Sequence, residues 1–218
     1  MIASLAHAPA APHGEAPSRT RPPIIEALRE GTRAAHDRIE QNRVMGRLTQ
    51  PDLDLTDYTL VLKRMLGLHL ALEGPLAAAL AHRRIPLGLD QRRKTPLLRR
   101  DLMALGALEP IAPASIDLAA LLADEPSAWG TLYVLEGSTL GGRIILRNVE
   151  RALGLTGENG ASFFAGYGER TGERWKVFVE ELAATHDRHP AWQAPIVAAA
   201  SACFDAMDTW LEESPLVQ

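Results

Sequence analysis

The sequence predicts an all-helical protein folded as a single domain. Apolar residues recur at three- and four-residue steps along most of the chain, which is the spacing of one buried helical face. Short valine and isoleucine clusters all fall within that periodicity, and no hairpin dipeptide separates alternating apolar and polar runs. A length of 218 residues, with 46% hydrophobic and 23% charged residues, suits one domain with a sizeable core.

The N-terminal 23 residues predict a flexible tail, because they are rich in alanine and proline. They contain no basic leader and no continuous apolar core, so they do not predict a secretory signal. The helical domain is expected over residues 24–214, with a short tail at 215–218. No uninterrupted apolar run approaches the roughly 20 residues that span a bilayer, so we expect no membrane partner.

The first two helices are predicted from their start signals and apolar stripes. Pro22 and Pro23 suit a helix entry, because proline lacks the donor that a first turn leaves unpaired. A second, longer helix is expected after residues 51–54, interrupted or bent near Gly74 and Pro75. The two stripes are Ile25, Leu28, Thr32, Ala35 and Ile39 in the first helix, and Leu60, Met65, Leu68, Leu72, Leu76 and Leu80 in the second.

The remaining elements follow in order. Thr95 is expected to cap a third helix, with proline at the first helical position. After a brief apolar turn, Pro126 marks either a stop or the start of the next element. Helical spacing then covers 127–153, a glycine-rich connection covers 154–168, and two amphipathic helices are expected over 170–187 and 190–214.

Charge and cysteine content narrow the class of protein. A net charge of -4 gives no global reason to expect a nucleic-acid partner, since phosphate binding needs clustered positive charge. The single cysteine, Cys203, cannot form an intrachain disulfide and predicts a buried thiol in a reducing compartment such as the cytoplasm. The basic run over residues 82–100 is typical of a solvated face, or of a docking surface for an acidic redox partner.

His36 is the strongest candidate for a metal ligand. Arg29, Arg33, His36 and Glu40 are separated by three- or four-residue steps, which brings them to one side of a helix. A neutral imidazole binds iron through one ring nitrogen, and an acceptor such as Glu40 fixes its orientation through the other. The arginines suit the carboxylates of a cofactor. A surface helix with solvated charges explains the same pattern.

Glycines interrupt the later helical segment LEGSTLGGRII, residues 135–145. Each interior glycine costs about 0.5–1 kcal/mol relative to alanine, so Gly137, Gly141 and Gly142 need a compensating reason. They favour either close helix packing or a backbone that lies against a planar ligand. The spacing GSTLGG is not a dinucleotide-binding fingerprint, because no strand precedes it.

These two segments resemble those of the heme oxygenase family. The motifs LREGTRAAHDRIE, residues 28–40, and LYVLEGSTLGGRIILRNVERALGL, residues 132–155, occur in the family's order and separation. The resemblance covers roughly residues 25–185 and includes HLALE, ASFFAGYG and RWKVF. It is closest to the bacterial enzymes associated with bacteriophytochromes. It implies an all-α fold with heme held between a proximal and a distal helix.

The resemblance also implies roles for individual residues. His36 is the expected ligand of the heme iron, with Glu40 supporting it. The other implied positions are Arg29, Arg33 and Lys176 for the heme propionates, and Gly137, Gly141 and Gly142 for the distal helix. Many family members carry an aspartate immediately after the first of these glycines, where it holds a water network that delivers protons. This chain has Ser138, a hydroxyl without the carboxylate's charge, which we expect in that network.

The implied activity is oxidative cleavage of heme, which serves as both substrate and cofactor, to biliverdin, carbon monoxide and ferrous iron. Dioxygen and an external donor, a ferredoxin or reductase, are the expected partners, since no flavin motif is visible and the cysteines of an iron–sulfur cluster are missing. Biliverdin is the expected chromophore for a bacteriophytochrome. Two alternatives remain: a heme carrier or sensor without turnover, and a helical enzyme that acts without iron on another small molecule.

Overall fold

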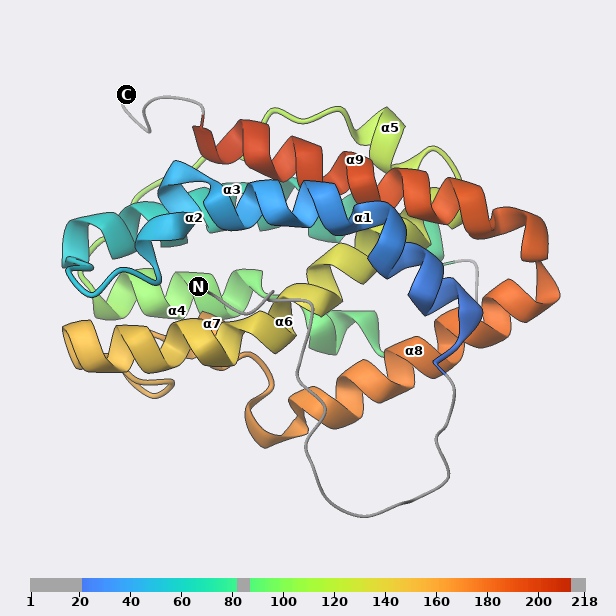
Figure 1. Ribbon diagram of the computed structural model, residues 1–218. Helices are drawn as coiled ribbons and strands as arrows, with labels where there is room; N and C mark the ends of the chain where they lie inside the picture. The colour runs from blue at the N-terminus through green and yellow to red at the C-terminus, as the bar shows by residue number, and fades with distance from the viewer. Residues whose placement is uncertain (1–20, 82–86, 213–218) are drawn as a thin grey trace, which may run out of the picture.

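The computed structural model describes residues 21–81 and 87–212, and this part of the chain is built from helices (Figure 1). Its only β-type pairs are isolated bridges that join Thr156 to Asn159 and Gly160. The predicted all-α class is therefore confirmed. The predicted C-terminal tail, and nearly all of the N-terminal one, lie outside the described residues. In the described part of the chain, no helix is both long and apolar enough to cross a membrane.

Three long helices form the frame of the fold: α1 (Pro23–Gln41), α6 (Glu125–Leu153) and α9 (Gln193–Glu212). Helix α9 packs along both α1 and α6 (Figure 1). A glycine is required at the crossing of α6 and α9, because a Cβ atom at Gly130 would lie 2.2 Å from the carbonyl oxygen of Ile196. Helix α1 starts at Pro23, as predicted, and buries the predicted apolar stripe.

Helix α3 (Leu55–Leu80) packs against α6 and α9. The short helices α2 (Arg43–Arg47) and α5 (Leu118–Leu122) pack against α3. Of the predicted interruption or bend near Gly74 and Pro75, the interruption is wrong, because α3 continues through Pro75. Leu72, Leu76 and Leu80 are buried on either side of the proline, and their burial offsets the loss of one backbone hydrogen bond.

Helix α4 (Thr95–Ala104) follows the 3-10 turn η1 (Leu89–Arg92), and its cap differs from the prediction. Thr95 is the first residue of α4, and its side chain does not accept a hydrogen bond from the backbone of that helix. Instead, the Glu73 carboxylate of α3 accepts hydrogen bonds from the backbone amides of Lys94 (2.5 Å) and Thr95 (3.1 Å). A buried carboxylate of another helix thus satisfies the first donors of α4.

The chain between α6 and α9 forms α7 (Ser162–Ala165), η2 (Gly168–Arg170), α8 (Thr171–Arg188) and η3 (Pro190–Trp192). Pro126 lies in the first turn of α6, so it marks a start rather than a stop. Helix α6 ends at Gly154, whose φ of 68° closes the helix in the left-handed region that favours glycine.

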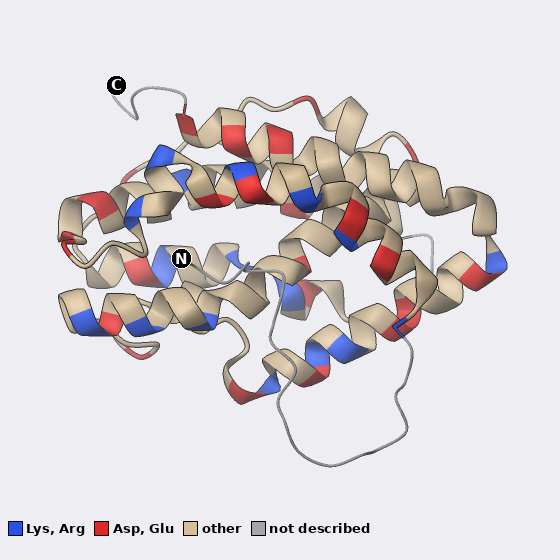
Figure 2. Cartoon of the chain, viewed as in Figure 1, with Lys and Arg blue, Asp and Glu red and all other residues tan. Residues whose placement is uncertain are grey.

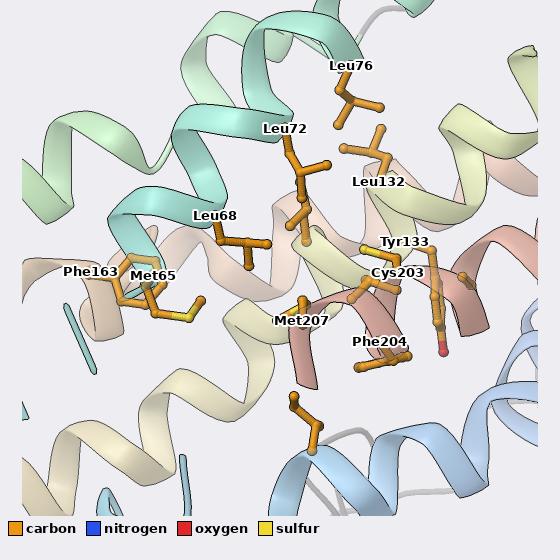
Figure 3. Close-up of a cluster of buried hydrophobic side chains, with 14 of the residues drawn as sticks. Met65, Leu68, Leu72, Leu76, Leu132, Tyr133, Phe163, Cys203, Phe204 and Met207 are labelled. Carbon is orange, nitrogen blue, oxygen red and sulfur yellow. The ribbon is translucent and has the colours of Figure 1, made fainter. Parts of the chain in front are cut away.

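The core fills the space between α3, α6 and α9. Figure 3 shows Leu72 and Leu76 of α3 near Leu132 of α6. Cys203 of α9 is fully buried in the same core, as predicted, and burial raises the pKa of its thiol to about 12. The thiol is therefore protonated at neutral pH and packs as a small apolar side chain.

Candidate functional site

A cavity lies between the helix that carries His36 and the glycine-containing middle of α6. Its empty volume is about 900 Å³, part of it open to solvent. Apolar side chains make up most of its wall, including Phe204 and Met207 of α9 and Met65 of α3 (Figure 3). The remaining described lining residues are Thr32, His36, Ile39, Met45, Lys94, Tyr133, Val134, Gly137, Ser138, Thr139, Gly141, Gly142, Ile145, Phe163 and Phe164.

His36 is held in a defined orientation on the α1 side of this cavity. The residue is only 9% exposed, and its ring meets the Phe204 ring edge-on, with the centroids 5.5 Å apart. Its Nδ1 atom lies 3.7 Å from Oε1 of Glu40, one helical turn later. At this distance the carboxylate acts on Nδ1 through its charge and the Phe204 ring restricts the imidazole, which leaves Nε2 as the nitrogen suited to binding a metal.

The α6 side of the cavity presents the three glycines of the sequence motif. A Cβ atom at Gly142 would lie 2.7 Å from the carbonyl oxygen of Phe164, so this glycine permits close packing against α7. Gly137, Gly141 and Gly142 also line the cavity. Close packing therefore explains Gly142, and the same stretch presents bare backbone to the cavity.

Three aliphatic hydroxyl groups line the cavity beside the phenol of Tyr133, and each of the three donates its hydrogen bond back to its own helix. Ser138 donates to the carbonyl of Leu135 at 2.8 Å. In the same way, Thr139 and Thr32 donate to the carbonyls of Glu136 and Leu28, at 2.6 and 2.7 Å. In this arrangement the three oxygens offer lone pairs to the cavity rather than protons.

The basic residues predicted from the sequence lie outside the cavity's described lining. Of these residues, Arg29 interacts with the cavity wall: burial raises the pKa of the hydroxyl of Tyr133, a lining residue, and the positive charge of Arg29 acts to lower it. The Nε atom of Arg29 is buried and has no hydrogen-bond partner. Arg33 is exposed. The Lys176 side chain is 65% exposed, with its Nζ atom 3.8 Å from Glu180.

The basic run is not simply a solvated surface. Arg92 and Lys94 are buried, and Arg92 pairs with the buried Glu136 of α6. The interpretation of the whole run as an exposed face is therefore wrong for these two residues. Residues 82–86 of the run lie outside the described residues. Lys94 also lines the cavity, a role that the sequence did not reveal because lysines are rarely buried.

A smaller cavity shares Lys94 with the large one and contains a cluster of titratable side chains. Its lining includes His69, Glu73, Arg92, Lys94 and Glu136. The Nδ1 atom of His69 lies 3.0 Å from Glu73, while its Nε2 atom is buried without a hydrogen-bond partner. Burial alone would raise the pKa of Glu73, but the hydrogen bonds and charge of His69, with the α4 donors, lower it to about 2.

A family model described as Heme oxygenase matches residues 23–213 of this chain. The chain belongs to the heme oxygenase family. A curated heme oxygenase from Xanthomonas campestris pv. campestris (strain 8004) is 37% identical over 108 residues. That match covers 50% of this chain and 62% of the relative, so it spans less than two thirds of the relative's length.

Solved heme oxygenases have the same fold. The NO- and CO-bound heme oxygenase from Neisseria meningitidis is 28% identical, with a TM-score of 0.70 over 86% of this chain and 89% of that one. Heme oxygenase-1 from the cyanobacterium Synechocystis sp. PCC6803, solved in complex with heme, is 17% identical, with a TM-score of 0.66 over 86% of this chain and 90% of that one. The second likeness supports the architecture alone.

Proposed function

We propose that this chain binds heme in the cavity between α1 and α6 and cleaves it oxidatively. The substrates are heme, dioxygen and external electrons, and the products are biliverdin, carbon monoxide and ferrous iron. The observation that carries the proposal is the position of His36, a buried and oriented imidazole, in the wall of an apolar cavity that also exposes the backbone of three glycines. Membership of the heme oxygenase family supports the reaction class.

An apolar cavity with one imidazole in its wall suits an apolar group that takes one nitrogen ligand. In the proposal, His36 Nε2 ligates the iron while Glu40 holds the ring from the Nδ1 side. When bound, heme supplies the iron centre at which dioxygen is reduced, and it is also the molecule that is cleaved. The apolar wall excludes water from the porphyrin and provides most of the affinity through burial.

The negative propionates of heme need cations at the edge of the cavity. Arg29 is the best placed, because a buried guanidinium nitrogen without a partner has donors available for a carboxylate. We assign Arg33 and Lys176 to the same edge. Both side chains are exposed, so their attraction to a propionate is screened by solvent and salt. They therefore contribute less to heme affinity than Arg29 does.

The distal side is assigned to α6. Gly137, Gly141 and Gly142 let the helix lie close over the porphyrin, and Ser138 offers a hydroxyl where a carboxylate is common in the family. Because Ser138 donates to Leu135, its oxygen acts as an acceptor for a water in the cavity. Ser138 therefore orients water, and the proton itself must come from another group.

Electrons are proposed to arrive from a separate ferredoxin or reductase in the cytoplasm, because the chain has one cysteine, and that one is buried. A bacteriophytochrome is the proposed consumer of biliverdin. A heme carrier or sensor without turnover is the alternative, and the serine at position 138 is the feature that favours it.

Heme titration of the purified protein tests the binding step. We expect a saturable change of the heme absorption band with one heme per chain, and an altered spectrum for His36→Ala because the axial nitrogen is lost. His186→Ala is the matched control, since His186 is absent from the cavity's described lining and should leave the spectrum unchanged. An unaltered His36→Ala spectrum would remove His36 as the ligand.

A further inference from the structure

Lys94 is the only lysine, arginine, aspartate or glutamate among the described residues that line the large cavity. It sits at the N-cap of α4, only 3% exposed, and it also lines the smaller cavity. Its side chain therefore forms part of the wall of both cavities. Burying a charged lysine lowers the stability of the fold, so its presence here calls for a physical reason.

The ammonium group of Lys94 is not held by an ion pair. Its Nζ atom donates to the carbonyl of Arg92 at 3.1 Å and lies over the Tyr167 ring, 3.5 Å from the centroid. No carboxylate lies within 4.0 Å of Nζ among the residues that the structure describes. Of the three donors of an ammonium group, the Arg92 carbonyl takes one.

The two nearest carboxylates are already committed to other donors. Glu136 accepts from the Tyr167 hydroxyl at 2.7 Å through one oxygen and from Arg92 through the other. Both oxygens of Glu73 accept from α4, from the Thr95 amide at 3.1 Å and the Thr95 hydroxyl at 2.8 Å. These carboxylates act on Lys94 through their charge, and among the described residues the Arg92 carbonyl is the acceptor of its ammonium group.

We propose that Lys94 is the proton-holding group of the ligand cavity, the residue that donates a hydrogen bond to water or an oxygen ligand on the distal side. The inference rests on the proposed heme site. Serine and threonine oxygens in the cavity wall act as acceptors, because they donate to their own helices. Lys94 provides the donor and the positive charge that these hydroxyls lack.

The groups that face Lys94 set its protonation. Burial lowers its pKa to about 8, Glu136 and Glu73 raise it, and Arg92 and Arg174 lower it. Lys94 is thus mostly protonated at pH 7 and gives up its proton more readily than a lysine in water. His69 and Glu73 line the smaller cavity, which Lys94 also lines.

A pH titration of the visible spectrum of the ferric heme complex tests the inference without turnover. A nearby positive charge favours hydroxide over water on the iron, so Lys94→Met should raise the pKa of the iron-bound water by about one unit. Lys94→Arg keeps the charge and should leave that pKa close to the wild-type value. Lys63→Met is the matched control, because Lys63 pairs with Glu109 at 2.5 Å and is absent from the cavity's described lining.

Each outcome decides between distinct accounts. A shift for Lys94→Met but not for Lys63→Met supports the inference. An unchanged pKa in Lys94→Met, with heme bound as in the wild type, overturns it and leaves the heme site intact. A tenfold or larger loss of heme affinity with an unchanged pKa assigns Lys94 to a propionate instead and also overturns it. Failure of the wild-type protein to bind heme would instead contradict the proposed function itself.

Discussion

The Nδ1 atom of His36 lies 3.7 Å from Oε1 of Glu40, and both residues belong to one face of α1. Side chains four residues apart on a helix are neighbours, so the local sequence creates this pair before any tertiary contact forms. Phe204 of α9 then meets the imidazole from the side. The orientation of the proposed iron ligand thus depends on one local contact and one tertiary contact.

Replacing Glu40 by glutamine should weaken heme binding about tenfold, because changing the partner of a metal-bound histidine costs 10–100-fold in affinity. The amide can still accept a hydrogen bond, but it removes the negative charge beside the ring. Heme titration with absorbance detection measures the change. Glu30→Gln, an exposed change on the same helix, serves as the control, and equal affinities for all three proteins would show that Glu40 does not support the ligand.

Replacing Ser138 by alanine should slow ring opening several-fold while leaving heme affinity unchanged. The reason is that the hydroxyl oxygen accepts from cavity water and contributes little to apolar burial. Single-turnover absorbance traces with reductant measure the rate, and a titration measures the affinity. A rate equal to that of the wild type would exclude Ser138 from water placement.

Replacing Gly142 by alanine should destabilise the protein by about 1–3 kcal/mol, because the new Cβ atom would overlap the Phe164 carbonyl in a packed interior. Gly172→Ala provides the opposite control. That position lies in the first turn of α8, is exposed and has no neighbouring atom within 4 Å of the added Cβ, so alanine should stabilise the protein by at most about 0.5–1 kcal/mol. Urea unfolding followed by circular dichroism measures both, and destabilisation by both changes would contradict the packing argument.

Replacing Lys94 by methionine should raise the free energy of unfolding of the heme-free protein at pH 7. Lowering a lysine pKa from 10.5 to about 8 corresponds to a cost of about 3 kcal/mol for keeping the charged form in the fold. Below pH 8 the lysine is charged in both states and the full cost is present. Between pH 8 and 10.5 the folded state sheds its proton first, so wild-type stability rises relative to the variant.

Urea unfolding of both proteins at pH 7 and pH 10 checks this sign. The advantage of Lys94→Met should be largest at pH 7 and smaller at pH 10. A variant that is less stable than the wild type at pH 7 would show that the ammonium contributes favourably to the fold. A residue that lowers the stability of the fold and lines a cavity is typical of a functional site.

Much of the fold could be predicted from the sequence, because helical periodicity and start signals are local. The stripe of α1 and the entry at Pro23 are confirmed. The errors at Pro75 and Thr95 have tertiary causes: buried leucines hold α3 together, and Glu73 of another helix caps α4. Neither cause can be recognised from spacing along a single helix.

The candidate site was predictable where one helix carries it. His36 and Glu40 meet as expected, and the glycines of α6 line the cavity. Lys94 was hidden within a basic run, since its burial depends on α6 and on the loop that carries Tyr167. Long-range packing of this kind leaves no periodic signal in the sequence.

Figure 2 shows acidic and basic residues distributed over the helices, in keeping with the small net charge. Several of these charged side chains are paired between helices, such as Arg38 of α1 with Asp205 of α9, and both side chains of this pair are exposed. Exposed pairs of this kind contribute little to stability. Charge therefore affects the stability of the fold most at the buried groups around Lys94.

The most direct measurement is single turnover of the purified heme complex with dioxygen and a chemical reductant, followed by product chromatography. The account predicts loss of the heme absorption band, release of ferrous iron and carbon monoxide, and one equivalent of biliverdin. His36→Ala should lose this reaction. Heme that stays intact and bound to the reduced wild-type protein under dioxygen would contradict the proposed cleavage and establish a heme carrier instead.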